Sequence, residues 1–111
     1  MSVIYSKFQH EVADLGKVKE NTSCSAIYQF EPIVENNPVF KYAIPSCGCM
    51  ISTWDNNTNR LTVKYSTGSI SQFHRDLSMS ELPQEKTITV FVDELGSLKE
   101  HLLTIKLTII L

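Results

Sequence analysis

The chain has 111 residues, of which 42% are apolar and 20% charged, and its net charge is −2. This length suits a single domain spanning residues 1–111, able to bury a core without a metal ion. The composition lies far from that of disordered chains. Because the basic residues are few and scattered, we expect no nucleic-acid partner. We also expect no membrane span, since no apolar run approaches the about 20 residues that a bilayer requires.

The N-terminal residues 1–7 contain neither a basic leader nor an apolar segment of about 7–15 residues, so we expect no signal peptide. The protein is therefore predicted to be cytoplasmic or part of a virion.

In chain order, the first expected element is an irregular strand over residues 8–18, anchored by Phe8, Leu15 and Val18. Strict two-residue alternation follows in residues 24–31, 39–44, 61–65 and 86–92, and in the C-terminal run 103–111. Such alternation is typical of half-buried antiparallel strands. The side chains that share a face within their runs are Cys24, Ala26, Tyr28 and Phe30; Phe40, Tyr42 and Ile44; Leu61, Val63 and Tyr65; Ile88, Val90 and Val92; and Leu103, Ile105, Leu107, Ile109 and Leu111.

Short turn-forming clusters separate these runs, at Gly16 and at residues 35–38, 55–59, 66–69 and 93–97. One helical turn is expected at residues 79–85, where Pro83 limits its length. It belongs to a long polar connection, residues 71–84, which could carry recognition. Six or seven strands in a domain of this size favour two packed sheets. The predicted fold class is therefore all-β: an immunoglobulin-like antiparallel β-sandwich of about seven strands.

The ordered set of strands resembles the bacterial family known as domain of unknown function 1573, a relative of the Hydin-type immunoglobulin-like domains. The opening Asp14-Leu15-Gly16-Lys17-Val18 is similar to a segment of that family, and Ser46-Cys47-Gly48-Cys49 matches its Ser-Cys-Gly-Cys motif. The likeness covers about residues 8–110. It implies the immunoglobulin-like fold and no particular activity. The segment between Tyr65 and Lys86 is longer than in the family, which suggests a domain reused in another setting, such as a phage virion.

The three cysteines, Cys24, Cys47 and Cys49, are an odd and sparse set, which predicts free thiols rather than a disulfide framework. Cys47 and Cys49 would share one face of an extended strand and could bind a soft ion such as Cu(I) or handle redox equivalents. Alternatively, the two small side chains fill core space beside Gly48. No cofactor is expected, and these two residues are the candidate metal ligands.

Catalysis has no positive sequence signal. Ser71, His74 and Asp76 invite comparison with a triad, but triads are assembled by folding and no nucleophile elbow accompanies them. His10, His74 and His101 stand singly in polar surroundings, and we interpret them as surface residues.

Three apolar side chains are candidates for partner binding. Trp54 could be a core plug or a binding hot spot. Phe91 and Ile110 fall on the otherwise Thr- and Lys-rich faces of neighbouring strands, where they could form one contact patch. The sequence thus favours a non-enzymatic structural or interaction module, plausibly a decoration or assembly component of a phage virion or other large complex, with a protein partner or copies of itself. The alternative function is a small thiol protein acting through Cys47 and Cys49.

Overall fold

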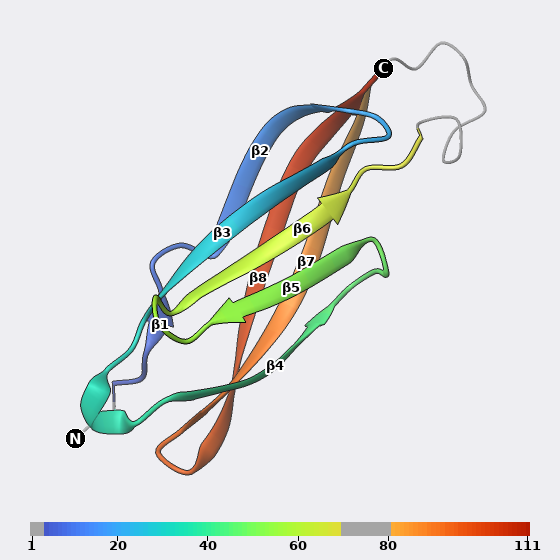
Figure 1. Cartoon of the computed structure of the whole chain (residues 1–111). Coiled ribbons are helices and arrows are strands. Elements are labelled where there is room, and N and C mark those ends of the chain that lie inside the picture. The colour runs from blue at the N-terminus through green and yellow to red at the C-terminus, as the bar shows by residue number, and fades with distance from the viewer. Residues whose placement is uncertain (1–3, 70–80) are drawn as a thin grey trace.

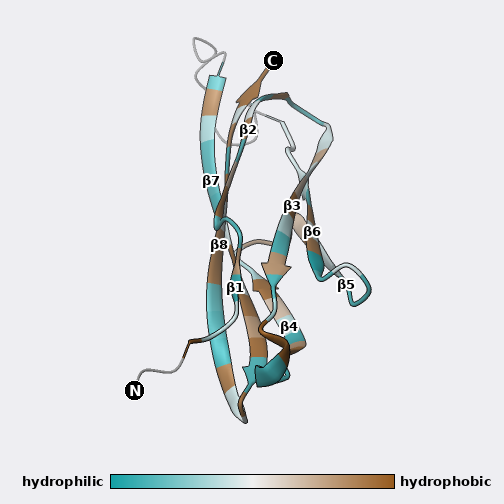
Figure 2. Ribbon diagram, turned by 90° about the vertical axis from the view of Figure 1, so that its left-hand side faces the viewer, coloured by the Kyte–Doolittle hydropathy of each residue, from teal (hydrophilic) through white to brown (hydrophobic). Residues whose placement is uncertain are grey.

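The fold is a sandwich of two four-stranded sheets, described for residues 4–69 and 81–111 of the computed structural model. The first sheet has the strand order β1-β3-β6-β5, and the second has the order β2-β8-β7-β4. Figure 2 shows the two sheets as separate layers. The elements are β1 (Lys7–Phe8), β2 (Val12–Lys19), β3 (Ser23–Glu31), the 3-10 turn η1 (Val34–Asn36), β4 (Val39–Pro45), β5 (Met50–Asp55), β6 (Arg60–Ser66), β7 (Glu81–Glu94) and β8 (Ser97–Ile110).

This strand order confirms the predicted immunoglobulin-like sandwich. The last two strands, β7 and β8, lie side by side in one sheet with β2 and β4, and the other four strands form the sheet that faces them. The strand count is eight rather than seven. The expected first strand is divided: β1 pairs antiparallel with β3, and the chain then crosses to the other sheet, where β2 pairs in parallel with β8. One pair is therefore not antiparallel. β5, which no alternating run in the sequence predicted, pairs with β6 at the edge of the first sheet.

The longest element is the β7–β8 hairpin, whose two strands have 14 residues each. It spans nearly the whole molecule (Figure 1), which measures 56 × 28 × 20 Å. The radius of gyration is 16.4 Å, compared with about 13 Å for a compact domain of this length, so the molecule is elongated.

The predicted helical turn at residues 79–85 is wrong for the part that the structure describes, because Glu81 already begins β7. Residues 71–80 of the expected connection lie outside the described residues.

The core lies between the inner faces of the two sheets and confirms the predicted alternation. Tyr28, Leu61, Val63, Val90 and Leu103 are completely buried. The other buried apolar side chains are Phe8, Ala26, Phe30, Met50, Tyr65, Leu82, Ile88, Val92, Ile105, Leu107 and Ile109, whereas Leu111 is exposed. The Tyr28 hydroxyl donates a hydrogen bond of 2.6 Å to the backbone oxygen of Thr104, which joins the two sheets through the core. Burial raises the pKa of Tyr28 to about 12. No helix in residues 4–69 and 81–111 is long and apolar enough to cross a membrane.

A buried carboxylate, Glu94, fixes the end of the sandwich where the β7–β8 hairpin turns. Its oxygens accept hydrogen bonds from the Ser6 backbone N–H (2.9 and 3.1 Å), the Ser6 hydroxyl (2.7 Å) and the Asn36 amide (2.8 Å). The Ser6 hydroxyl in turn accepts a bond from the Ile33 N–H, and Asn36 also donates to the Ile4 carbonyl. Glu94 therefore ties the N-terminal segment and the β3–β4 connection to the hairpin.

Burial alone would raise the pKa of the Glu94 carboxyl, but the hydrogen bonds from Ser6 and Asn36 outweigh it and hold the pKa below its usual value. A carboxyl whose pKa is lower in the folded state stabilises the fold above its unfolded pKa of about 4.3. That contribution is lost as the pH falls through the lower, folded pKa.

We expect Glu94→Gln to lower the free energy of unfolding by about 1–3 kcal/mol at pH 7, because the new amide group faces donors that need an acceptor. Urea denaturation at neutral and acidic pH measures the effect. The difference in free energy of unfolding between the parent protein and the variant should become smaller below about pH 4. Equal stability of the two proteins at pH 7 would show that the carboxylate does not hold this end together.

Candidate interaction surface

The outer face of the second sheet carries a cluster of exposed apolar side chains at the end where β4 joins β7 and β8. In one row of the sheet, Tyr42 of β4 lies opposite Phe91 of β7, and in the next row Ile44 and Leu102 flank Thr89. We call this cluster the outer apolar patch; its exposed members are Val39, Tyr42, Ile44, Leu98 and Leu102, and Phe91 is partly buried among them. Ile44 is 54% exposed and Leu102 is 57% exposed, so the patch faces solvent in the isolated chain.

An aromatic stack lies within the patch. The rings of Tyr42 and Phe91 are 4.6 Å apart and nearly parallel, at 27°. Stacked pairs of this kind are held by favourable ring contacts across neighbouring strands. Because Tyr42 is 47% exposed, the stack presents part of its aromatic surface to solvent.

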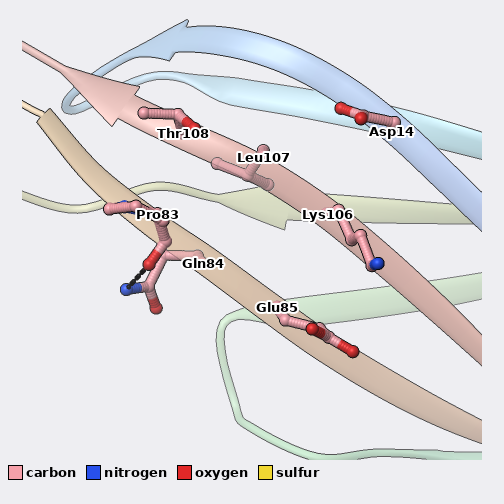
Figure 3. A pocket seen from close by; sticks show the side chains of 7 residues that line it. All are labelled: Asp14, Pro83, Gln84, Glu85, Lys106, Leu107 and Thr108. Atoms are coloured by element: carbon pink, nitrogen blue, oxygen red, sulfur yellow. Dashed lines mark hydrogen bonds between the residues drawn. The ribbon is translucent and has the colours of Figure 1, made fainter.

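The other half of the same face is charged. A shallow depression there is lined by Asp14 of β2, by Glu85 of β7 and by Lys106 of β8 (Figure 3), together with Pro83, Gln84, Leu107 and Thr108. Nearby, the Lys17 ammonium lies 2.8 Å from the Glu81 carboxylate. Alternating charges on a strand face are typical of a solvated surface. The contrast between the two halves of this one face marks the apolar end as distinct.

A β-bulge in β4 directs two of the patch residues outward. The register with β7 shifts between Phe40 and Tyr42, so the strict alternation of the strand is interrupted at Lys41. Phe40 therefore packs against the core, whereas Tyr42 and Ile44 lie on the outer face. The expectation that all three share one face is wrong for Phe40, because alternation alone does not reveal an extra residue in a strand.

Trp54 lies on the core side of β5. Its ring stacks on Phe40 at 4.8 Å and 7°, and it meets Phe30 edge-on at 5.9 Å. The indole N–H donates a hydrogen bond of 2.6 Å to the Asn56 side-chain oxygen. These contacts favour the core alternative for Trp54, although part of the side chain remains exposed.

Phe91 and Ile110 lie on the same outer face but not in one patch. Ile110 is opposite Glu81, ten residues before Phe91 in β7. At about 3.3 Å per residue, the two side chains are about 33 Å apart. The residues that do surround Phe91 are Tyr42, Ile44, Leu98 and Leu102, which the sequence reasoning did not select. Leu98 and Leu102 could have been found from the sequence. They are apolar residues on the polar face of β8, just as Phe91 is an apolar residue on the polar face of β7.

Cys47 and Cys49 are joined in a disulfide, so the prediction of three free thiols is wrong; Cys24 is the free cysteine. Both bonded residues are partly buried and pack against the core. Closing so short a loop removes little chain entropy, and the chain-entropy relation gives only about 1.6 kcal/mol, against about 3 kcal/mol for a 15-residue loop. Burial raises the pKa of the Cys24 thiol.

The remaining chemistry-bearing residues do not converge. The His10 ring packs on Tyr28 at 5.5 Å, and His101 lies half-buried between Phe8 and Phe30, where burial lowers its pKa. His101 is therefore not the surface residue that was expected. Residues 71, 74 and 76 lie outside the described residues. In the described part of the chain, no three His, Cys, Asp or Glu side chains are grouped closely enough to hold a metal ion.

The hairpin turn beside the patch holds a leucine in an unfavourable backbone conformation. Leu95 and Gly96 form the two-residue turn between β7 and β8, with φ values of 55° and 77°. Two-residue turns of this type prefer Asn-Gly, because a branched apolar side chain is strained at positive φ. Because Leu95 is 51% exposed, packing in the core does not explain why a leucine stands at this position. Strain of this kind is often found in residues kept for binding rather than for stability.

We expect Leu95→Asn to raise the free energy of unfolding by about 0.5–1 kcal/mol, because Asn tolerates positive φ and loses no core contact here. Thermal denaturation measures the shift. The matched control is Gly96→Ala, which should destabilise the fold through its backbone alone, since a Cβ at Gly96 would meet nothing within 4 Å. A Leu95→Asn protein less stable than its parent would contradict this account of the turn.

No protein-family model and no curated protein matches the chain. Among solved structures, the chain is similar to an endo-fucoidan hydrolase from glycoside hydrolase family 107, with a TM-score of 0.54 and 8% sequence identity. The match covers 96% of this chain and 14% of that hydrolase, so this chain corresponds to one small part of a much larger protein. At this identity the likeness shows a shared fold alone.

Proposed function

We propose that the chain is a non-enzymatic interaction module that binds a protein partner through the outer apolar patch. The observation that carries this proposal is the gathering of six apolar side chains, including a stacked Tyr42–Phe91 pair, at one end of a sheet face. Contiguous exposed apolar side chains of this kind mark interaction sites on soluble domains. Aromatic residues in the centre of such a surface are enriched among binding hot spots.

The chemistry of the patch favours a protein over other kinds of partner. Two acidic side chains, Asp93 opposite Leu98 and Glu100 opposite Phe91, lie among the patch residues and would repel phosphate groups. The chain as a whole is slightly acidic. A surface of aromatic and aliphatic side chains that also carries some polar groups is typical of protein–protein interfaces.

The shape of the patch supports a binding role rather than catalysis. Its residues are spread over the outer side of β4, β7 and β8, whereas the residues of enzyme and small-molecule sites converge in a concavity. We further propose that the module is an accessory part of a larger assembly, such as a phage virion. The support for this is the segment between Tyr65 and Lys86, which is longer than in the family that the sequence resembles and suggests a domain reused in another setting. A copy of this same chain is one possible partner within such an assembly.

Site-specific photocrosslinking in the native host tests the proposal. A benzophenone side chain at position 42, and separately at position 102, should give a discrete crosslinked protein species. The matched control position is Thr53, which is exposed on the outer face of the other sheet and should give no such species. Ile44→Glu should weaken the crosslink from position 42 by tenfold or more, about 1.4 kcal/mol, by placing a charge in the interface.

The proposal is wrong if positions 42 and 102 give no crosslink, or if Thr53 gives the same species equally well. Mass spectrometry of the crosslinked species distinguishes a second copy of this chain from a different partner.

A further inference from the structure

The turn between β4 and β5 carries the Cys47–Cys49 disulfide and is also held by hydrogen bonds to both sheets. On one side, the Ser46 N–H donates to the Thr87 carbonyl at 2.9 Å, and the Thr87 N–H donates to the Ser46 hydroxyl at 3.2 Å. On the other side, the Ser66 N–H donates to the Cys49 carbonyl at 3.0 Å. These bonds fix the turn to β7 in one sheet and to β6 in the other. The disulfide joins residues that the backbone already holds together.

The spacing of the two cysteines is compatible with the backbone hydrogen bonds of the turn. The Cα atoms of Cys47 and Cys49 are 5.3 Å apart, within the usual range for a disulfide, and the backbone bonds of the turn hold them there. After reduction the two thiols would remain neighbours, so closing the ring again would be an intramolecular step. The turn is therefore suited to repeated opening and closing.

The disulfide is also accessible from one side. Cys47 and Cys49 pack partly against the core, but neither is fully buried, and Ser46 and Gly48 are exposed. A Cβ placed on Gly48 would meet nothing within 4 Å. Gly48 thus adds no side chain that would hinder an incoming thiolate at the middle of the ring. Exposed disulfides are the ones that take part in exchange, whereas structural ones are usually buried.

We propose that Cys47 and Cys49 form a thiol–disulfide exchange site that oxidises a dithiol substrate. One substrate thiolate attacks a sulfur of the Cys47–Cys49 bond, forming a mixed disulfide and releasing the other cysteine as a thiolate. The second substrate thiolate then attacks the mixed disulfide. The substrate becomes a disulfide, Cys47 and Cys49 become thiols, and two electrons with two protons pass from substrate to protein. This activity does not depend on the outer apolar patch.

The test uses the Cys24→Ser variant, so that the thiols counted belong to Cys47 and Cys49. The air-oxidised protein is mixed with a reduced synthetic peptide that contains two cysteines, and both species are followed by mass spectrometry after thiol alkylation. We expect one peptide disulfide formed, and two protein thiols gained, for each chain. The far-ultraviolet circular dichroism spectrum should stay unchanged, because the turn is held by its backbone hydrogen bonds.

Two further variants separate the exchange from other effects. Cys47→Ser/Cys49→Ser should lose peptide oxidation completely while keeping the β spectrum. Cys49→Ser, made in the Cys24→Ser background, leaves one thiol, that of Cys47. It should collect a mixed disulfide when mixed with an excess of the disulfide-linked dimer of a single-cysteine peptide, because neither the protein nor the attached peptide then has a second thiol to resolve it. If either variant failed to fold, the measurement on the Cys24→Ser protein would still stand.

The proposal is overturned if Cys47 and Cys49 are found as thiols in air-oxidised protein. It is equally overturned if their disulfide resists the peptide until urea unfolds the domain. Crosslinking from position 42 would be unaffected by either result, so failure here is distinguishable from failure of the proposed binding function.

Discussion

The structure depends on the packing of one face of the β7–β8 hairpin against the inner face of the first sheet. Val90 and Leu103 of the hairpin belong to the same core cluster as Tyr28 and Leu61 of the first sheet. All four side chains are completely buried. Because strand side chains alternate, burying one face of the hairpin necessarily turns the other toward solvent. The hairpin is so long that its outer face has room for two different surfaces. The core therefore sets both the fold and the position of the patch.

Two local features near the turn of the hairpin determine which side chains lie on the outer face and how firmly the turn is held. At the turn, the buried Glu94 binds Ser6 and Asn36, which holds the tip in a single arrangement although it projects beyond the rest of the second sheet (Figure 1). Alongside β7, the bulge in β4 rotates Tyr42 and Ile44 out of the core and places them beside Phe91. A surface built on paired strands is more rigid than one built on loops, so a partner would lose little affinity to ordering.

The sequence predicts the interior of this protein better than its surface. Two-residue alternation identified the inward side chains of β3, β6, β7 and β8 because burial imposes that pattern directly. It failed where a local feature breaks the count: the bulge at Lys41, the division of the first strand at β1 and β2, and the short edge strand β5, whose inner face includes Ser52. Of the patch residues, the sequence identified only Phe91 as a binding candidate, because the members come from β4, β7 and β8 and meet only in the folded sheet. The bond between Cys47 and Cys49 was also missed, because cysteine count does not show which sulfurs a turn brings together.

The claim on which these conclusions rest is that β8 buries one side in the core and exposes the other, where Leu98 and Leu102 lie. Methyl nuclear magnetic resonance of the dilute isolated domain, with a soluble nitroxide added, measures this directly, because the nitroxide broadens the signals of methyl groups that it can approach. The methyl signals of Ile44, Leu98 and Leu102 should broaden strongly, while those of Leu103 and Ile105 should persist. Equal protection of Leu102 and Leu103 would contradict the account, because it would mean that the outer side of the hairpin is not free to bind anything.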